Sequence, residues 1–282
     1  MQKSLTKYFP AFVLPTLAAF SIAFLVPFVM GIVLSFSDFT IVTDARFNGF
    51  DNYVRAFTDP SSNFVYALGF TALFTVVSII TVNILAFLLA MLLTRGLKGT
   101  NLFRGVFFVP NLIGGIVLGY VWNTILNAIL SNFDLTLMYS ANLGFWGLII
   151  VNSWQMIGYM MIIYIAGIQN IPGDLKEAAA IDGANKRQTL FRITLPLVMP
   201  SITICTFLTL TNSFKLFDQN LALTGGGPSN MTEMLALNIY HTFYGRNGWS
   251  GPGQAKAVVF FALVGVIALI QLRITRSKEV EN

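Results

Sequence analysis

The sequence has few of the residues on which enzymatic and metal chemistry depend. Its 282 residues include one histidine, His241, and one cysteine, Cys205. A single cysteine excludes an intrachain disulfide, and a single histidine beside it excludes a Cys/His metal cluster. Cys205 lies inside an apolar run, where a free thiol usually packs as a small buried side chain. No nucleophile–base pair or cofactor motif stands out, so we expect no catalytic, cofactor or metal site.

Charged residues are also scarce. They make up 10% of the chain, whereas a soluble domain usually carries about 25%. Hydrophobic residues make up 55%, and the mean hydropathy is +0.72. The net charge is +5, but the basic residues are scattered over short loops, which argues against a nucleic-acid partner. The composition therefore indicates a protein whose solvent is the lipid bilayer.

Long apolar segments run along the whole chain. A helix needs roughly 20 apolar residues to cross a bilayer core. The run from Tyr8 to Phe36 exceeds the ~7–15 apolar residues of a signal peptide, so we interpret it as a retained first span. The sequence predicts one all-α, polytopic membrane domain over 1–282 with six transmembrane helices, at 9–36, 64–93, 106–126, 143–168, 197–221 and 257–272.

Lysine and arginine residues predict the orientation of these spans. With the N-terminus in the cytoplasm, 12 of the 17 basic residues fall in cytoplasmic segments and 4 in the outer loops, while Lys215 lies in a span. Short cytoplasmic loops of membrane proteins carry an excess of Lys and Arg. We therefore expect both termini, and the loop at 170–196, to be cytoplasmic, with outer loops at 37–63, 127–142 and 222–256.

The most polar long segment lies in that cytoplasmic loop and reads EAAAIDGANKRQTLFRITLPLVMP. Asp174, with Glu177 three residues later, predicts a capped helix start. Gly183 predicts a left-handed helix end. A second helix is predicted to begin at Asn185, with Gln188 completing its cap, and to end near Pro196.

Basic residues give this segment a second interpretation. An amphipathic helix on the membrane surface would use Lys186, Arg187 and Arg192 to contact anionic headgroups. Local spacing alone does not decide whether the segment lies on the membrane surface or is a docking site for a partner protein.

The same segment resembles the EAA motif of ABC importer permeases. The run E-A-A-A-I-D-G-A at 177–184 is followed by Phe191, Ile193, Leu195, Pro196 and Pro200. A second string, L-T-G-G-G-P at 223–228, resembles the sugar-importer branch of that family, the maltose and glycerol-3-phosphate type. The six-span layout agrees with the family along nearly the whole chain.

The resemblance implies a type I ABC importer permease fold with a cytoplasmic coupling helix that sits in a cleft of a separate ATPase subunit. Glu177 would pair with a basic residue of the ATPase, and Gly183 would permit the turn that exposes the helix. No G-x-x-x-x-G-K-[ST] sequence occurs, so we expect ATP and Mg to bind to the ATPase and no cofactor to this chain. The coupling residues implied are Glu177, Ala178, Ala179, Asp182, Gly183 and Ala184.

The resemblance also implies partners and a function. The partners are a second permease of the family, two ATPase subunits, an extracytoplasmic solute-binding protein and the lipid of a bacterial-type cell membrane. The function is one half of an alternating-access pathway for a carbohydrate, either a di- or oligosaccharide or a solute like glycerol-3-phosphate. The alternatives are an importer permease for a non-sugar solute and a stand-alone secondary carrier. A carrier usually needs intramembrane acids and often shows inverted repeats, whereas only Asp218 qualifies here and no repeat is visible.

Polar residues within the spans are the candidates for a substrate pathway, because such residues are costly in a bilayer. Helical spacing puts Asn152, Gln155 and Tyr159 on one face, and Asn212, Lys215 and Gln219 on another. Lys215 and Asp218, three residues apart, can neutralise each other. The predicted pathway residues are Asn152, Ser153, Gln155, Tyr159, Thr209, Asn212, Ser213 and Asp218.

Other interpretations of these polar residues remain open. Asn, Ser and Thr side chains can join helices to each other by hydrogen bonds instead of contacting a solute. Tyr120, Trp122 and Asn123 are further candidates for the pathway, although a tryptophan is also typical of the membrane interface. The segment 232–244 has a helical apolar pattern, which indicates either a packing helix or an outer surface that faces the binding protein.

Overall fold

The computed structural model describes residues 13–96 and 98–276, and almost every element in them is a helix. The chain divides into two compact units, which are described separately: 13–64 with 239–261, and 65–238 with 262–276. The start of the expected first span, at 9–12, lies outside the described residues. Lys3, Lys7 and Lys278, which contribute to the predicted orientation, also lie outside them.

The first unit begins with an apolar helical run over Val13–Leu34, in which the π-helix η1 (Ser21–Leu25) leads into α2 (Val26–Leu34). A small hairpin follows, in which Ser37 lies opposite Phe47. The remaining elements are β1 (Ser37–Asp38), η2 (Val42–Asp44), β2 (Arg46–Phe47), α3 (Asp51–Thr58), η3 (Pro60–Ser62) and residues of α13 (Leu235–Gly245) and α14 (Ser250–Arg276).

Two fully buried polar side chains join the parts of this unit. Asn52 on α3 donates hydrogen bonds to the carbonyl oxygens of Ser35, at 3.0 Å, and Ser37, at 2.8 Å. Lys256 on α14 donates to the Ser62 carbonyl at 2.9 Å and to the Thr242 hydroxyl at 2.8 Å. The sequence places Lys256 in an outer loop, whereas the structure places it inside a helix that begins seven residues earlier than the expected sixth span.

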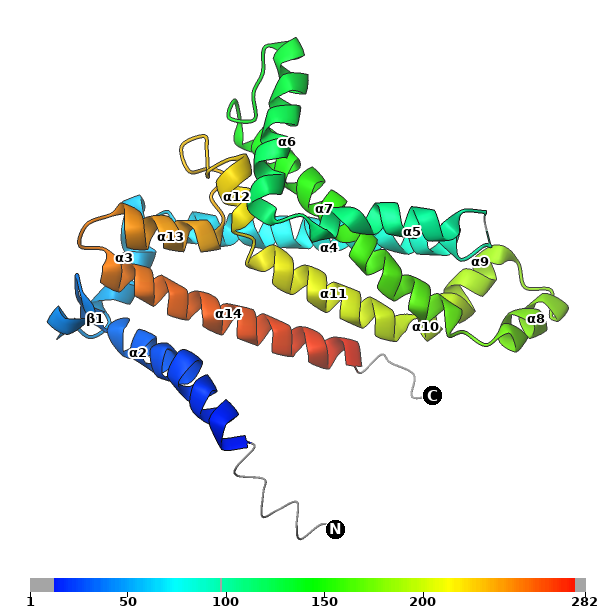
Figure 1. Ribbon diagram of the computed structural model, residues 1–282, viewed down its shortest axis with the longest axis horizontal. Helices are drawn as coiled ribbons and strands as arrows, with labels where there is room; N and C mark the ends of the chain where they lie inside the picture. Colours follow the sequence, from blue (N-terminus) through cyan, green and yellow to red (C-terminus); the bar gives the residue numbers. More distant parts are fainter. Residues whose placement is uncertain (1–12, 97, 277–282) are drawn as a thin grey trace, which may run out of the picture. The chain divides into compact units, whose positions relative to one another are not determined.

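The second unit contains the longest helices. In Figure 1, α11 runs beside α7, and α12 lies against α6. Its elements are α4 (Phe64–Leu93), α5 (Thr100–Phe108), η4 (Val109–Leu112), α6 (Gly115–Leu130), η5 (Ser131–Phe133), α7 (Ala141–Gln169), α8 (Gly173–Ile181), α9 (Lys186–Thr189), η6 (Leu190–Thr194), α10 (Leu195–Leu197), α11 (Met199–Phe214) and α12 (Asp218–Leu223).

Two buried apolar clusters hold these helices together. One includes Ala86 of α4, Met160 of α7 and Cys205 of α11, and the other includes Phe74 of α4 and Leu148 of α7. Cys205 is fully buried, as expected for a packing thiol. The outward faces of α4 stay apolar and exposed, which is typical of helices that face lipid rather than water.

Five helical segments among the described residues are long and apolar enough to cross a membrane: Val13–Leu34, Phe64–Leu93, Gly115–Phe133, Ala141–Gln169 and Ser250–Gln271. A sixth is added if Lys186–Leu197 and Met199–Phe214, which meet at an angle of 67°, form one broken span. The chain is thus built as a multi-pass membrane protein.

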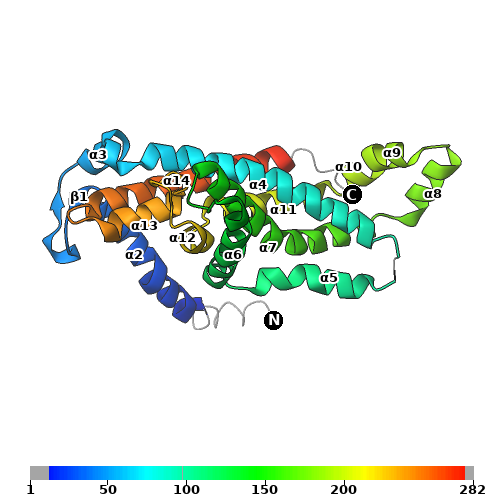
Figure 2. The same cartoon turned by 90° about the horizontal axis from the view of Figure 1, so that it is seen from above.

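The third and fifth expected spans differ from the helices of the structure. The range 106–126 is not one helix, because α5 ends at Phe108 and the chain turns through η4, with Pro110 near its start, before α6 begins at Gly115. Figure 2 shows α5 and α6 running in different directions. The range 197–221 is interrupted at 215–217, between α11 and α12. Apolar runs do not reveal such breaks, because proline and glycine are tolerated within spans.

Candidate functional site

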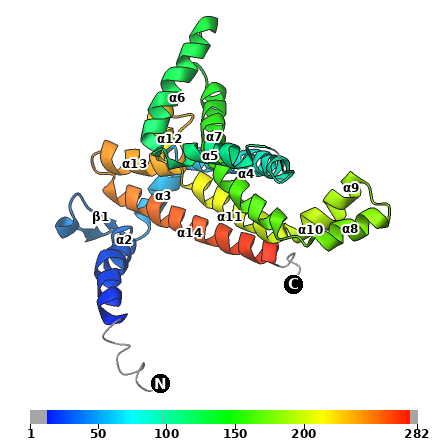
Figure 3. The ribbon, with the colours of Figure 1, turned by 45° about the vertical axis from the view of Figure 1, so that its right-hand side comes forward.

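The polar segment after α7 forms two short helices joined by a tight turn (Figure 3). The amide of Gly183 donates to the Ala180 carbonyl at 3.1 Å, and the amide of Ala184 donates to the Ala179 carbonyl at 2.9 Å. This pair of bonds is a Schellman motif, and Gly183 has the positive φ, +76°, that the motif requires. The predicted glycine stop is confirmed.

The caps of the two helices were predicted with unequal success. α9 begins with a capping box in which the side chains of Asn185 and Gln188 each accept a hydrogen bond from the other's backbone amide, as expected. The predicted start of α8 is wrong. Pro172 precedes the helix without a side-chain cap, so Asp174 already lies in the first turn.

The turn presents much of this segment to the surroundings. Glu177, Ala178, Asp182 and Gly183 are exposed, and Ala184 is half-buried. Ala179 is buried within the chain. Ile181 is 86% exposed, although it is a large apolar side chain on a polar segment.

A cavity of about 350 Å³ lies between α7, the η4–α6 junction and the α11–α12 break. Five amide side chains line it, together with one cation and one carboxylate. Backbone breaks supply two of its walls, as is common where irregular backbone borders a cavity in a membrane. The polar and charged lining residues are Asn111, Asn152, Gln155, Asn212, Lys215, Asp218 and Gln219.

The structure brings four of the eight predicted pathway residues to this cavity: Asn152, Gln155, Asn212 and Asp218. Lys215 and Gln219 line it with them, but through the break between α11 and α12 rather than on one continuous helix face. Within the described chain, no ion pair joins Lys215 to Asp218.

The other four predicted residues lie elsewhere. Ser153 lies within 3.3 Å of the Thr81 hydroxyl, and Thr209 donates to the Cys205 carbonyl and accepts from Asn83. Thr81 and Asn83 belong to α4, so Ser153 and Thr209 take part in hydrogen bonds between helices. This agrees with the alternative interpretation, in which such side chains join helices instead of contacting a solute. Tyr159 packs against the apolar cluster around Met160, and Ser213 is buried.

The further candidates of α6 do not line the cavity either. Asn123 donates to the Leu223 carbonyl at 2.6 Å and so ties α6 to α12. Trp122 packs edge-on against Trp154 of α7, with ring centroids 5.4 Å apart. Tyr120 is 63% exposed. All three serve packing or the lipid-facing surface in this arrangement.

Hydrogen bonds between the walls order the cavity. Gln155 donates to the Ile113 carbonyl at 2.9 Å and accepts a hydrogen bond from the Gln219 amide. Asn152 donates to the Ser78 hydroxyl at 3.2 Å. The Gln219 carbonyl oxygen is buried and has no partner among the described residues. Gln155 thus connects α7 with both breaks.

Sequence reasoning missed five residues that line the cavity: Met156, Leu216, Phe217, and the pair Asn111 and Gly115. Both flank the break before α6, and Gly115 lets Asp218 approach: a Cβ on Gly115 would lie 2.7 Å from the Asp218 Cβ. One turn further along α6, a Cβ on Gly119 would lie 2.6 Å from the Ala222 Cβ. The G-x-x-x-G spacing at 115–119 was the available signal for this close packing.

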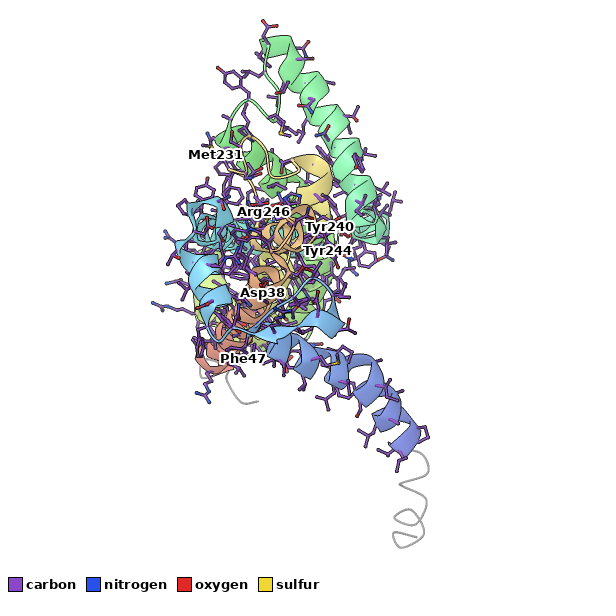
Figure 4. The ribbon with its side chains drawn as sticks, turned by 90° about the vertical axis from the view of Figure 1, so that its left-hand side faces the viewer. Asp38, Phe47, Met231, Tyr240, Tyr244 and Arg246 are labelled. Carbon is purple, nitrogen blue, oxygen red and sulfur yellow. The ribbon has the colours of Figure 1, made fainter. Side chains whose placement is uncertain are left out.

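Most of the segment 232–244, for which a helical pattern was predicted, lies in helix α13 (Leu235–Gly245). Tyr240 and Tyr244, labelled in Figure 4, lie one turn apart with ring centroids separated by 5.1 Å. Both are exposed, Tyr244 at 73%. The helix therefore packs through part of its surface and presents two tyrosines on another part.

Comparisons with known proteins agree on one family. The model of the binding-protein-dependent transport system inner membrane component matches residues 83–279. A probable starch degradation products transport system permease protein of Thermoanaerobacterium thermosulfurigenes is 45% identical over 278 residues, covering 96% of this chain and 94% of the relative. A multiple sugar-binding transport system permease protein of Streptococcus mutans is 31% identical and covers 99% of each chain.

A solved structure shares the fold over nearly the whole chain. It is the structure of a bacterial ABC transporter involved in the import of the acidic polysaccharide alginate. The likeness has a TM-score of 0.82 with 23% sequence identity, and it covers 98% of each chain. At this identity the likeness establishes the arrangement of helices and nothing about the solute.

Proposed function

Because this chain belongs to the family of binding-protein-dependent transport system inner membrane components, we propose that it forms half of the pathway by which an ATP-driven importer moves an oligosaccharide. The second half is another permease of the family, two ATPase subunits hydrolyse ATP, and an extracytoplasmic binding protein delivers the solute. Both termini lie in the cytoplasm, in accordance with the distribution of basic residues.

The cavity lined by amides carries the proposal. Amide groups both donate and accept hydrogen bonds, which suits the hydroxyl groups of a sugar. Lys215 and Asp218 bring opposite charges, so the cavity favours an uncharged solute over an anion. Phe217 offers an aromatic ring to the C–H surface of a sugar ring. The names of two relatives, which refer to starch degradation products and to multiple sugars, support the same class of solute.

Transport then follows from movement of the helices around this cavity. The ATPases close on ATP and draw together the coupling segments of the two permeases, which in this chain comprise α8, the turn at Gly183 and α9. Glu177, Ala178 and Ile181 are the exposed groups of α8 that would contact the ATPase. The same loop continues through η6 and α10 into α11, whose far end lines the cavity. A displacement at the coupling segment therefore reaches the solute site through one continuous stretch of chain.

Co-purification and uptake test this proposal. A tagged chain purified from native membranes in mild detergent should bring with it a second EAA-bearing permease and a Walker-motif ATPase. Cells that express the set with its binding protein should accumulate radiolabelled maltotriose, an oligosaccharide of starch. Purification of the chain alone would contradict its role as a subunit of an importer. Co-purification without maltotriose uptake would contradict only the proposed class of solute.

A further inference from the structure

A second cavity, of about 790 Å³, lies between the coupling segment and the ends of two spans. Its lining includes Arg95, two residues after the end of α4, and Lys186 and Arg187 at the start of α9. No aspartate or glutamate among the described residues lines it. Three cations from two separate segments therefore face one space without a carboxylate to balance them.

The remaining wall of this cavity is largely apolar. Met91 of α4, Ile168 of α7 and Leu190 of η6 supply it, and three threonines add hydroxyl groups. The Arg187 guanidinium lies over the ring of Phe191 in η6, 5.9 Å from its centre. A ligand that fits this lining has an anionic head and an apolar body.

A neighbouring cavity of about 280 Å³ gives a contrast within the same segment. Asp182 and Arg192 both line it, so its charges are balanced. An excess of cations is thus not a general property of the polar segment. Of these two cavities, only the one beside the ends of α4 and α7 has an excess of cations among its described lining residues.

We propose that the larger cavity binds the phosphate headgroup of an anionic phospholipid, with acyl carbons against the apolar wall. Arg95, Lys186 and Arg187 would contact the phosphate, since charge-assisted bonds to phosphate are among the strongest in proteins. Basic pockets at the cytoplasmic ends of spans suit anionic headgroups. Free phosphate would leave the apolar wall and most of the volume unfilled. The position at the inner leaflet rests on the proposed orientation.

The proposal gives the coupling segment a second attachment. A bound headgroup would join Arg95, at the end of a span, to α9 of the coupling segment. The proposal differs from a loop helix that lies on the membrane surface, because such a helix would use Arg192 as well as Lys186 and Arg187. Arg192 does not line this cavity and so distinguishes the two arrangements.

Lipid binding to the purified full chain tests the proposal, together with whatever subunits accompany it. Native mass spectrometry would measure the affinity for phosphatidylglycerol, with phosphatidylcholine as the neutral lipid and inorganic phosphate as competitor. We expect Arg95→Gln and Lys186→Gln each to weaken phosphatidylglycerol binding at least about tenfold, since each removes a charge-assisted bond to the phosphate. Arg192→Gln, the matched control with the same charge change, should bind like the wild type.

Four outcomes would overturn the proposal. Equal phosphatidylglycerol binding by all variants would show that the lipid does not bind in this cavity. An equal loss in Arg192→Gln would indicate diffuse attraction to the basic loop. Displacement of the lipid by millimolar phosphate would assign the cavity to a free anion. Loss of the ATPase from Arg95→Gln with unchanged lipid binding would assign the cavity to a carboxylate of that partner. Because the readout is lipid binding, failure of sugar uptake would leave it unaffected.

Discussion

Polar side chains within the spans fall into two groups according to what they contact. The Tyr164 hydroxyl donates to Asn83 at 2.8 Å, and Asn83 donates in turn to Thr209, so this group joins α4, α7 and α11. Asn212 belongs to the other group, because it is exposed at the cavity and its side chain has no hydrogen bond within the described chain. Residues of the second group keep their whole hydrogen-bonding capacity for a solute.

We therefore expect Asn212→Leu to impair uptake without destabilising the chain. The change removes an amide from the cavity and breaks no intramolecular hydrogen bond. Loss of one neutral hydrogen bond of ~0.5–1.5 kcal/mol predicts about a 2- to 10-fold rise in the KM for maltotriose uptake. Initial rates of labelled maltotriose uptake would measure it.

Asn132→Leu provides the matched control. It makes the same chemical change at an exposed position of η5 that does not line the cavity. Its KM should equal that of the wild type. An unchanged KM in Asn212→Leu would show that Asn212 does not contact the solute.

At the scale of elements, the α8–α9 turn depends on one glycine. Gly183 has a φ of +76°, and a residue with a β-carbon pays about 1–2 kcal/mol in that region. We expect Gly183→Val to lower uptake at least about tenfold, because that strain is large enough to shift the turn away from its docking geometry. Uptake and the amount of chain in the membrane would be measured together.

Gly173→Ala is the control for this prediction. Gly173 begins α8, its φ is not positive, and a Cβ there would meet nothing within 4 Å. The variant should transport normally. Normal uptake by Gly183→Val would show that the shape of the turn does not matter for coupling.

The contact between α6 and α12 also depends on a glycine, Gly119, which has no β-carbon. A methyl group on Gly119 would overlap Ala222, and overpacking of this kind costs ~1–3 kcal/mol. We expect Gly119→Ala to lower the Tm of the purified chain by about 2–4 °C for each kcal/mol lost. The double variant Gly119→Ala, Ala222→Gly should recover most of the loss, because the overlapping methyl group is then absent.

Gly105 on α5 provides the matched glycine, because a Cβ there meets nothing within 4 Å. Gly105→Ala should keep or raise the Tm, since alanine is the better helix former. Equal Tm values for Gly119→Ala and Gly105→Ala would contradict the close packing of α6 against α12.

At the scale of the whole molecule, the proposed orientation predicts which loops an external reagent reaches. Cys205 is fully buried, so the natural thiol should give little background with a membrane-impermeant maleimide. We expect Asn132→Cys to be labelled in intact cells and Lys98→Cys only after permeabilisation. The reverse pattern would invert the orientation, and with it the cytoplasmic position of the coupling segment.

Local features of the chain were predictable because their causes lie within a few residues. The apolar runs identify a multi-pass membrane protein, since a bilayer requires each span to satisfy its own backbone. Gly183 and the pair Asn185 and Gln188 specify a stop and a start, because both caps are bonds between near neighbours. The EAA motif is equally local and identified the family.

The cavity depended on the tertiary structure. Asn111 and Asp218 are far apart in sequence, and they line one cavity at a place where Gly115 lets α12 approach α6. Helical spacing placed Tyr159 with Gln155, yet Tyr159 packs against the apolar cluster that includes Met160 and does not line the cavity. The sequence by itself therefore determined the multi-pass class, the helix stop at Gly183, the helix start at Asn185 and the family, because these depend on apolar runs, bonds between near neighbours and a local motif. Only the tertiary structure decided which polar groups share one space, because that choice depends on helix breaks and close contacts between distant residues.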